Sequence, residues 1–194
     1  MGDPIITQLV KDLHDPKQQI NVICMGIRSS GKSTKALGLA RYCVDNDLFD
    51  EYFLFLPAAN REIAGSYNWL SQYRKVHIFT EWTPLFYLLD RPAAEVQKGK
   101  GSLIFLDDLG STGMNASDPY WHRVVSQQRH ERVSVIMNFH LLASQRIISP
   151  FCCQNCSYFF MLTPYGLLQS SPMSRCCVVH SYNIWTIVHS IQAS

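Results

Sequence analysis

The residues best suited to chemistry stand in one glycine-bounded segment, Gly26-Ile27-Arg28-Ser29-Ser30-Gly31-Lys32-Ser33-Thr34. Its spacing, G-x-x-x-x-G-K-S, is typical of a loop whose backbone N–H groups surround a β-phosphate. In such a loop Lys32 bridges the β- and γ-phosphates, and the hydroxyl of Ser33 binds the magnesium ion that screens them. The segment therefore predicts a site for ATP and Mg²⁺. Arg28 has two equal interpretations, a contact to a phosphate or a solvated side chain.

The flanking sequence supports this interpretation, because a phosphate-binding loop needs a strand before it and a helix after it. Residues 20–25 form an unbroken apolar run that predicts a buried strand, and residues 34–46 have a helical pattern. The positive end of that helix would point at the phosphates. The alternative is a glycine-rich turn that matches the motif by chance.

A second chemical motif lies at Leu103-Ile104-Phe105-Leu106-Asp107-Asp108, where an apolar strand ends in two carboxylates. Asp107 is placed to hold magnesium, and Asp108 to polarise the attacking water as a general base. Alone, this pattern also fits a surface turn. Together with the phosphate-binding loop, it predicts the second half of a site for ATP hydrolysis.

Composition limits the protein to a globular class. The chain has 194 residues, of which 47% are hydrophobic and 16% charged, and its formal charge is only +2. No apolar run is long enough to span a bilayer, and the N-terminus has no pattern of a secretory signal, so we expect no membrane contact. Seven cysteines, an odd number, favour free thiols in an intracellular reducing compartment.

The order of elements predicts a single α/β domain over residues 1–194, with a core at about 18–165. Strands are expected at residues 20–25, 51–56, 75–80, 102–106, 133–137 and 157–162, and helices at 5–14, 34–46, 62–72, 83–89, from 92, from 118 and at 141–148. The segment 166–194 is expected to form a hairpin or edge strands. Strands that alternate with helices predict a mainly parallel, twisted sheet with helices on both faces.

The strand expected at residues 133–137 carries further information. Asn138-Phe139-His140 follows it, and it comes after the paired acids. This layout resembles the additional-strand (RecA/FtsK-like) class of P-loop NTPases, in which an extra strand lies between the loop strand and the acid strand. A polar residue at the tip of that strand then senses the γ-phosphate. Small nucleotide kinases usually lack the paired acids and have an arginine-rich lid.

From residue 102 to about 162 the chain resembles the FtsK–HerA superfamily, and within it the genome-packaging ATPases of poxviruses and giant viruses. The resemblance rests on the two Walker motifs, on Arg129-His130 followed by Val133-Ser134-Val135-Ile136, and on Asn155 followed by Tyr158-Phe159-Phe160. Outside the Walker motifs its specificity is moderate.

The chain departs from this family in three places. Either His140 or Asn138 occupies the position where the family has a sensor glutamine. The arginine expected before Asn155 is absent, so that Arg129, Arg132 or Arg146 is left as the candidate arginine finger. Asp108 replaces the commoner glutamate.

The resemblance implies an ATPase that couples hydrolysis to translocation of double-stranded DNA and packages a viral genome into the capsid. It implies a homo-oligomeric ring, a hexamer or a pentamer, with a capsid or portal-vertex protein as a further partner, in the host cell or the virion. The alternatives are a helicase or AAA-type ATPase without packaging duties, a nucleoside or nucleotide kinase, and a nucleotide-dependent switch.

Two remaining features have structural alternatives. Zinc is not expected, because small thiols also pack sheet edges and the second cysteine pair is adjacent and not spaced as in a zinc knuckle. The set considered is Cys153, Cys156, Cys176, Cys177 and His180. The turn at residues 98–101 contains two lysines that fit DNA phosphates, but a solvated turn is the preferred interpretation.

Overall fold

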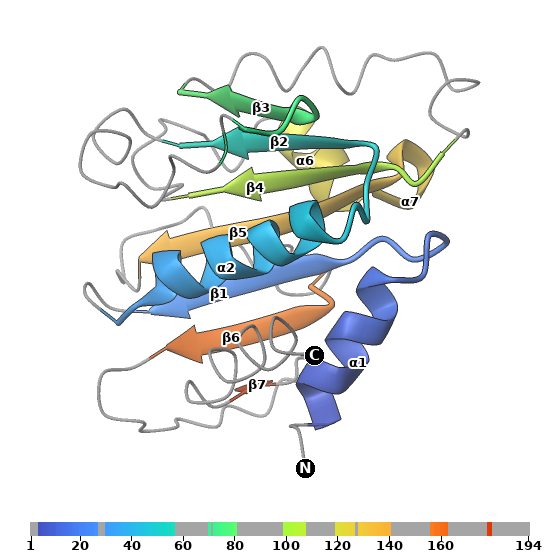
Figure 1. Ribbon diagram of the computed structural model, residues 1–194. Helices are drawn as coiled ribbons and strands as arrows, with labels where there is room; N and C mark the ends of the chain where they lie inside the picture. Colours follow the sequence, from blue (N-terminus) through green and yellow to red (C-terminus); the bar gives the residue numbers. More distant parts are fainter. Residues whose placement is uncertain are drawn as a thin grey trace.

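The computed structural model describes residues 4–26, 30–56, 70, 72–80, 99–107, 119–126, 128–140, 156–162 and 178–179. Within these residues the strands form one parallel sheet in the order β3-β2-β4-β5-β1-β6-β7, and all arrows in Figure 1 point the same way. The strands are β1 (Asn21–Gly26), β2 (Glu51–Phe55), β3 (Val76–Phe79), β4 (Ser102–Leu106), β5 (Val133–His140), β6 (Tyr158–Leu162) and β7 (Val178–Val179). The predicted parallel α/β sheet is confirmed.

Strand β5 lies between the loop strand β1 and the acid strand β4, as the additional-strand class requires. It pairs with β1 through Cys24↔Asn138 and Gly26↔His140, and with β4 through Leu106↔Met137. The strand is three residues longer than the expected 133–137, so Asn138 lies within the strand and not in the loop beyond it. This order brings the ends of the three strands next to one another.

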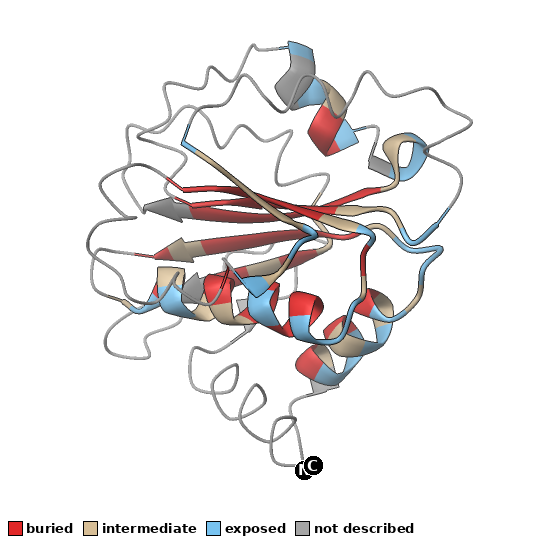
Figure 2. Cartoon of the chain, turned by 45° about the horizontal axis from the view of Figure 1, so that its top comes forward, coloured by how far each residue is buried: buried red, intermediate tan, exposed pale blue. Residues whose placement is uncertain are grey.

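Helices cover both faces of the sheet (Figure 2). Helices α1 (Pro4–Leu13) and α2 (Lys32–Asp45) lie on one face, and α6 (Pro119–Ser126) lies on the other. The short helix α7 (Gln128–Glu131) leads into β5. No helix in the described part of the chain has the length and apolar character needed to cross a bilayer.

The central strands send alternate side chains into two separate cores, as the period of a strand dictates. On β4, Leu103 and Phe105 pack in the core beneath α1 and α2, whereas Ile104 and Leu106 pack in the core with Val124 and Val125 of α6. The side chains of these strands are almost completely buried (red in Figure 2). Because both faces of these strands are buried, their sequences are continuous apolar runs.

The bounds of the expected elements need small corrections where the structure describes them. Helix α2 begins at Lys32 and not at residue 34, directly after Gly31, because the loop passes into the helix without a spacer. In the segment 166–194, strand β7 pairs parallel to β6 at the edge of the sheet. The second arm of the expected hairpin and the helices expected at 83–89 and 141–148 lie outside the described residues.

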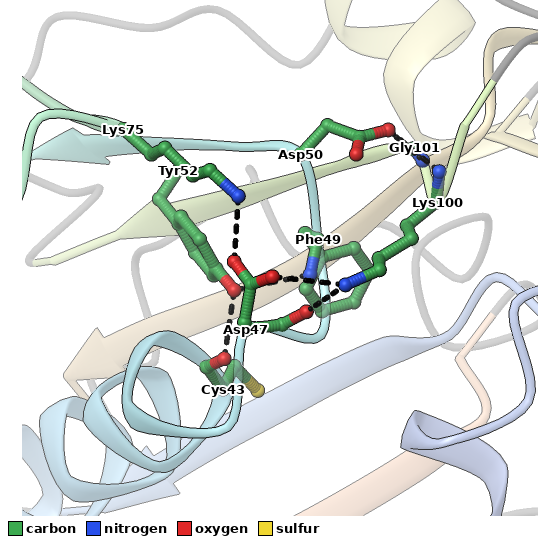
Figure 3. A network of polar contacts seen from close by, with 8 residues as sticks. All are labelled: Cys43, Asp47, Phe49, Asp50, Tyr52, Lys75, Lys100 and Gly101. Atoms are coloured by element: carbon green, nitrogen blue, oxygen red, sulfur yellow. Dashed lines mark hydrogen bonds and ion pairs between the residues drawn. The ribbon is translucent and has the colours of Figure 1, made fainter.

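A polar network ties the strands together at the end of the sheet where they begin (Figure 3). Asp47 accepts hydrogen bonds from Lys75 Nζ at 2.7 Å and from Lys100 Nζ at 3.0 Å, and these two bonds lower the pKa of the Asp47 carboxyl. Asp50 Oδ2 accepts from the backbone N–H groups of Lys100 and Gly101. Residues 99–101 thus lie at the end of the sheet opposite the carboxyl ends of the strands, and Lys100 is part of this network.

Replacing Gly101 with alanine is expected to lower the free energy of unfolding by about 2–4 kcal/mol. The φ angle of Gly101 is +89°, and a Cβ there would lie 2.4 Å from the backbone oxygen of Arg132. That oxygen already accepts a hydrogen bond from Ser102 N, so it is not free to move away. Urea denaturation of both proteins measures the change.

The matched control is Gly38→Ala in the middle of α2, where an added Cβ meets no atom within 4 Å. Alanine should stabilise the helix there by about 1 kcal/mol. Equal unfolding midpoints for the two variants would contradict the close approach at Gly101.

Candidate active site

The expected phosphate-binding loop lies between the end of β1 and the start of α2. Gly26 is the last residue of β1, and Gly31 precedes the helix with a φ of +76°, a left-handed conformation that favours glycine. The first turn of any helix has N–H groups without intrahelical acceptors, and its dipole attracts anions. Of the remaining predicted loop residues, Ile27, Arg28 and Ser29 lie outside the described part of the chain.

Three loop residues that the structure describes lie at or just before the start of α2. The side chain of Lys32, at the first position of α2, is only 4% exposed. Thr34 is exposed on the same first turn. The Oγ atom of Ser30 is buried and has no hydrogen-bond partner among the described residues. A buried hydroxyl without a partner is costly, so a polar ligand beside Ser30 would satisfy it.

The second half of the site is joined to the first by a cluster of three side chains. Ser33 Oγ donates a hydrogen bond to Asp107 Oδ1 at 3.2 Å, so the α2 residue and the residue after β4 meet directly. The amide of Asn138 on β5 donates to Ser33 Oγ at 2.8 Å and to Asp107 Oδ1 at 2.5 Å. The two residues predicted to hold magnesium are thus brought together, with Asn138 beside both.

This cluster is withdrawn from solvent. The side chain of Asp107 is 1% exposed and that of Asn138 is 0% exposed. Asn138 Oδ1 has no hydrogen-bond partner within the part of the chain that the structure describes. The backbone supports the cluster too, since Asp107 N donates to Phe55 O of the neighbouring strand at 3.0 Å. Charged groups in such a dry site act strongly on a bound ligand.

The donor set fits Mg²⁺. Ser33 Oγ and Asp107 are hard oxygen ligands, which Mg²⁺ prefers, and the Asn138 amide nitrogen lies beside both. Mg²⁺ usually needs only one or two carboxylates, because substrate phosphates and water complete its shell. Among the described residues no group of three or more His, Cys, Asp and Glu side chains is placed to hold a metal. A site of the P-loop kind does not require one.

The other predicted catalytic residues are only partly described. The backbone of His140 pairs with Gly26, so the residue lies next to the first residue of the loop motif. Its side chain is outside the described set. Asp108 follows Asp107 and is likewise not described. The roles of His140 as a sensor and of Asp108 as the base stay predictions.

Two of the candidate arginine fingers lie at the opposite end of the sheet in the same chain. Arg129 is exposed on α7, and Arg132 donates to Pro16 O at 3.0 Å just before β5 begins. Parallel strands place their starts far from their carboxyl ends, so neither arginine reaches the Ser33 and Asp107 pair of its own chain. Arg146 lies outside the described residues. A role in the site of a neighbouring copy stays a prediction.

The thiol beneath the loop is not suited to nucleophilic chemistry. Burial raises the pKa of the Cys24 thiol to about 12, against the opposing effect of Lys35. Burial also lowers the pKa of the Lys35 ammonium. A thiol that stays protonated is a poor nucleophile, so Cys24 packs the core and the chemistry rests on oxygen groups.

Of the five residues considered for zinc, only Cys156 is described. Its Sγ lies 2.8 Å from Tyr158 O and 3.7 Å from Asn21 O, contacts that suit a packed thiol at the edge of β6. The other four lie outside the described residues.

The contact of Asn138 with Ser33 was not anticipated from the sequence, where Asn138 was considered only as a γ-phosphate sensor. The position of Asn138 near the end of its strand was the one feature of the sequence that could have predicted this contact. Once β5 is placed between β1 and β4, a polar residue near its carboxyl end must lie between the loop and the acid.

Comparison with solved structures shows the same fold. The chain is similar to B204, the DNA-packaging ATPase from Sulfolobus Turreted Icosahedral Virus, with a TM-score of 0.56 and 14% sequence identity over 79% of this chain and 77% of that chain. It is also similar to the genome packaging NTPase B204 from Sulfolobus turreted icosahedral virus 2 in complex with AMPPCP, with a TM-score of 0.53 and 14% identity over 81% of this chain and 78% of that one. The complex of the latter protein with ATP-gammaS gives a TM-score of 0.53, 13% identity and the same coverage. No protein-family model and no curated protein sequence matches the chain.

Proposed function

We propose that this chain is an ATP-hydrolysing DNA translocase that packages a double-stranded viral genome into a capsid. The observation that carries the proposal is the cluster of Ser33, Asp107 and Asn138, which the strand order β4-β5-β1 assembles at the carboxyl ends of the strands. In open parallel sheets, ligands bind at that edge. The likeness of the fold to two viral packaging NTPases supports the choice of a motor over other users of the same loop.

The residues divide the work of hydrolysis between binding and positioning. The loop N–H groups and Lys32 bind the phosphates, and Ser33 and Asp107 hold Mg²⁺. A bound magnesium ion supplies positive charge that screens the phosphate oxygens. Asp108 accepts a hydrogen bond from the attacking water and takes its proton as the water bonds to the γ-phosphorus and the β,γ-bridging oxygen leaves with ADP. In this proposal His140 is the sensor that contacts that phosphate.

The proposal includes a homo-oligomeric ring in which each site takes an arginine from a neighbouring copy. Arg129 is exposed and so accessible to a neighbouring copy. An arginine in trans stabilises the charge that develops on the transferred phosphoryl group, and it makes hydrolysis depend on assembly. Double-stranded DNA passes through the centre of such a ring of five or six copies, and a capsid or portal-vertex protein anchors it.

Double-stranded DNA is expected to stimulate ATP hydrolysis by about fivefold or more, the lower range of coupling between two sites. A motor couples the two because DNA binding favours the state in which the neighbouring arginine reaches the phosphates. Phosphate release at saturating ATP, measured with and without a blunt duplex, tests this expectation.

Control reactions separate the alternatives. A nucleoside added as acceptor should gain no phosphate, and transfer to it would replace the motor with a kinase. A forked duplex should not be unwound, and strand separation would favour a helicase. Hydrolysis that DNA leaves unchanged, even at a protein concentration that gives rings by light scattering, would contradict translocation.

A further inference from the structure

The amide nitrogen of Asn138 uses both of its hydrogens on the residues predicted to hold the metal. One N–H bond points at Ser33 Oγ, at 2.8 Å, and the other points at Asp107 Oδ1, at 2.5 Å. A side-chain amide has two hydrogens to donate and no more. In this geometry Asn138 has no N–H left for a phosphate oxygen.

We propose that Asn138 positions Ser33 and Asp107, the two residues that hold Mg²⁺, and that it does not contact the γ-phosphate. The inference rests on the proposed function, since it takes Ser33 and Asp107 as the groups that hold Mg²⁺. It changes the expected role of this strand residue. A sensor of the γ-phosphate distinguishes ATP from ADP, whereas a positioning residue acts equally on both nucleotides.

The hydrogen-bond pattern around Ser33 explains how the amide prepares the pair. The Ser33 hydroxyl donates its only hydrogen to Asp107 Oδ1 and accepts one bond from Asn138 Nδ2. A hydroxyl oxygen has two lone pairs, so one lone pair remains and its direction is set. Asn138 thereby orients the atom that binds the cation, as residues behind a metal ligand commonly do.

The oxygen of the same amide supports this assignment. Asn138 Oδ1 is buried and has no hydrogen-bond partner among the described residues. An amide oxygen only accepts, and the phosphate oxygens of ATP⁴⁻ also only accept, so the two repel each other. The atom suits a donor, either a water molecule or an ammonium group.

The strand holds the amide in this position. Asn138 is 0% exposed, and its backbone pairs with Cys24 of β1, while the residue before it pairs with Leu106 of β4. A side chain fixed by two neighbouring strands loses little entropy when it positions another group. The geometry is therefore a property of the sheet itself.

The test measures nucleotide affinity as a function of Mg²⁺ concentration. Binding of ADP and of a non-hydrolysable ATP analogue is followed by calorimetry, from EDTA up to millimolar Mg²⁺. Asn138→Leu keeps the branched shape and removes every polar atom, and Asn138→Ala serves if leucine does not fit. We expect the Mg²⁺ requirement to rise about tenfold for both nucleotides. Affinity in EDTA should change less than about twofold, because the loop binds the phosphates without the metal.

A matched control is available on the neighbouring strand. Asn21 is also 0% exposed, and its amide donates to Val125 O at 3.3 Å, at the end of β1 away from the loop. Asn21→Leu should lower the thermal unfolding midpoint and leave the Mg²⁺ requirement unchanged.

Three results would overturn the inference. A loss of affinity for the ATP analogue alone makes Asn138 a γ-phosphate sensor, and an unchanged Mg²⁺ requirement makes it a purely structural residue. If the wild-type protein binds neither nucleotide at any Mg²⁺ concentration, the proposed function fails and this inference fails with it. If wild type binds and the variant has the same Mg²⁺ requirement, the inference alone fails.

Discussion

Replacing Lys32 with alanine is expected to reduce the rate of ATP hydrolysis by at least about 100-fold, the cost of removing one group that stabilises charge in a dry site. Lys32 begins α2 directly after the left-handed Gly31, and its side chain is 4% exposed. Its ammonium group is the positive charge predicted to bridge the β- and γ-phosphates. Phosphate release at saturating ATP and Mg²⁺ measures the effect, and calorimetry with ADP measures the accompanying loss of affinity.

The matched control for this variant is Lys35→Ala, one turn further along the same helix. Lys35 lies near Cys24, and burial lowers its pKa, but it falls outside the phosphate-binding motif. The two variants remove the same charge from the same helix. Hydrolysis by Lys35→Ala should stay within about threefold of wild type, since a charge beyond the first turn adds little to an anion site. Equal losses in both variants would contradict the assigned role of Lys32.

The parts of the fold that sequence reasoning captured are those with local causes. The bounds expected for β4, residues 102–106, match the structure because the apolar run is buried on both faces of the sheet. Gly31 and Lys32 were assigned through a motif that describes local backbone geometry. Strand burial and loop conformation both depend on the types of a few neighbouring residues, so a short stretch of sequence predicts them.

The features of the fold and site that the sequence did not predict depend on contacts between residues far apart in the chain. The strand expected at residues 133–137 is longer in the structure, where β5 continues through Asn138 to His140. An asparagine is stable inside a buried strand only if distant groups satisfy it. Its partners, Ser33 and Asp107, are 105 and 31 residues away, so no local pattern reveals them.

The arginine finger likewise depends on contacts that the sequence of one chain does not show. Arg129, Arg132 and Arg146 are the candidates because the arginine expected before Asn155 is absent, and of these Arg129 and Arg132 lie where β5 begins, at the end of the sheet away from Asp107. A finger that acts in trans is determined by the interface between copies. Neither spacing nor hydrophobic pattern within one chain encodes that interface directly.

Asp107→Asn is expected to lower ATP hydrolysis by about 100- to 1,000-fold while the protein keeps its fold. Asparagine has the same shape, and its side-chain oxygen can still accept hydrogen bonds from Ser33 and Asn138, which now meet the carboxylate. What is lost is the negative charge that holds Mg²⁺. The Mg²⁺ concentration for half-maximal nucleotide binding should rise about 10- to 100-fold. Affinity in EDTA should not fall, because removing a buried negative charge near the phosphates reduces repulsion.

Asp45→Asn is the matched control, because it makes the same substitution on the outer surface of α2. Asp45 pairs with Arg41 at 3.4 Å and accepts from Tyr73, both in exposed contacts. Surface pairs of this kind contribute little, so hydrolysis and the Mg²⁺ requirement should both match wild type. If Asp107→Asn hydrolysed ATP at more than about a tenth of the wild-type rate, Asp107 would not be the metal-holding acid.

The double variant Asp107→Asn with Asn138→Leu tests whether Asn138 acts on Mg²⁺ binding through Asp107. If Asn138 acts through the metal pair, the double variant should lose less Mg²⁺ affinity than the two single losses together. Residues in direct contact usually show such non-additivity, whereas independent sites add. The 2.5 Å contact between Asn138 Nδ2 and Asp107 Oδ1 predicts a coupling of about 1 kcal/mol, within the range for residues in direct contact. Additive losses would show instead that the asparagine acts on the nucleotide by a route that does not pass through Asp107.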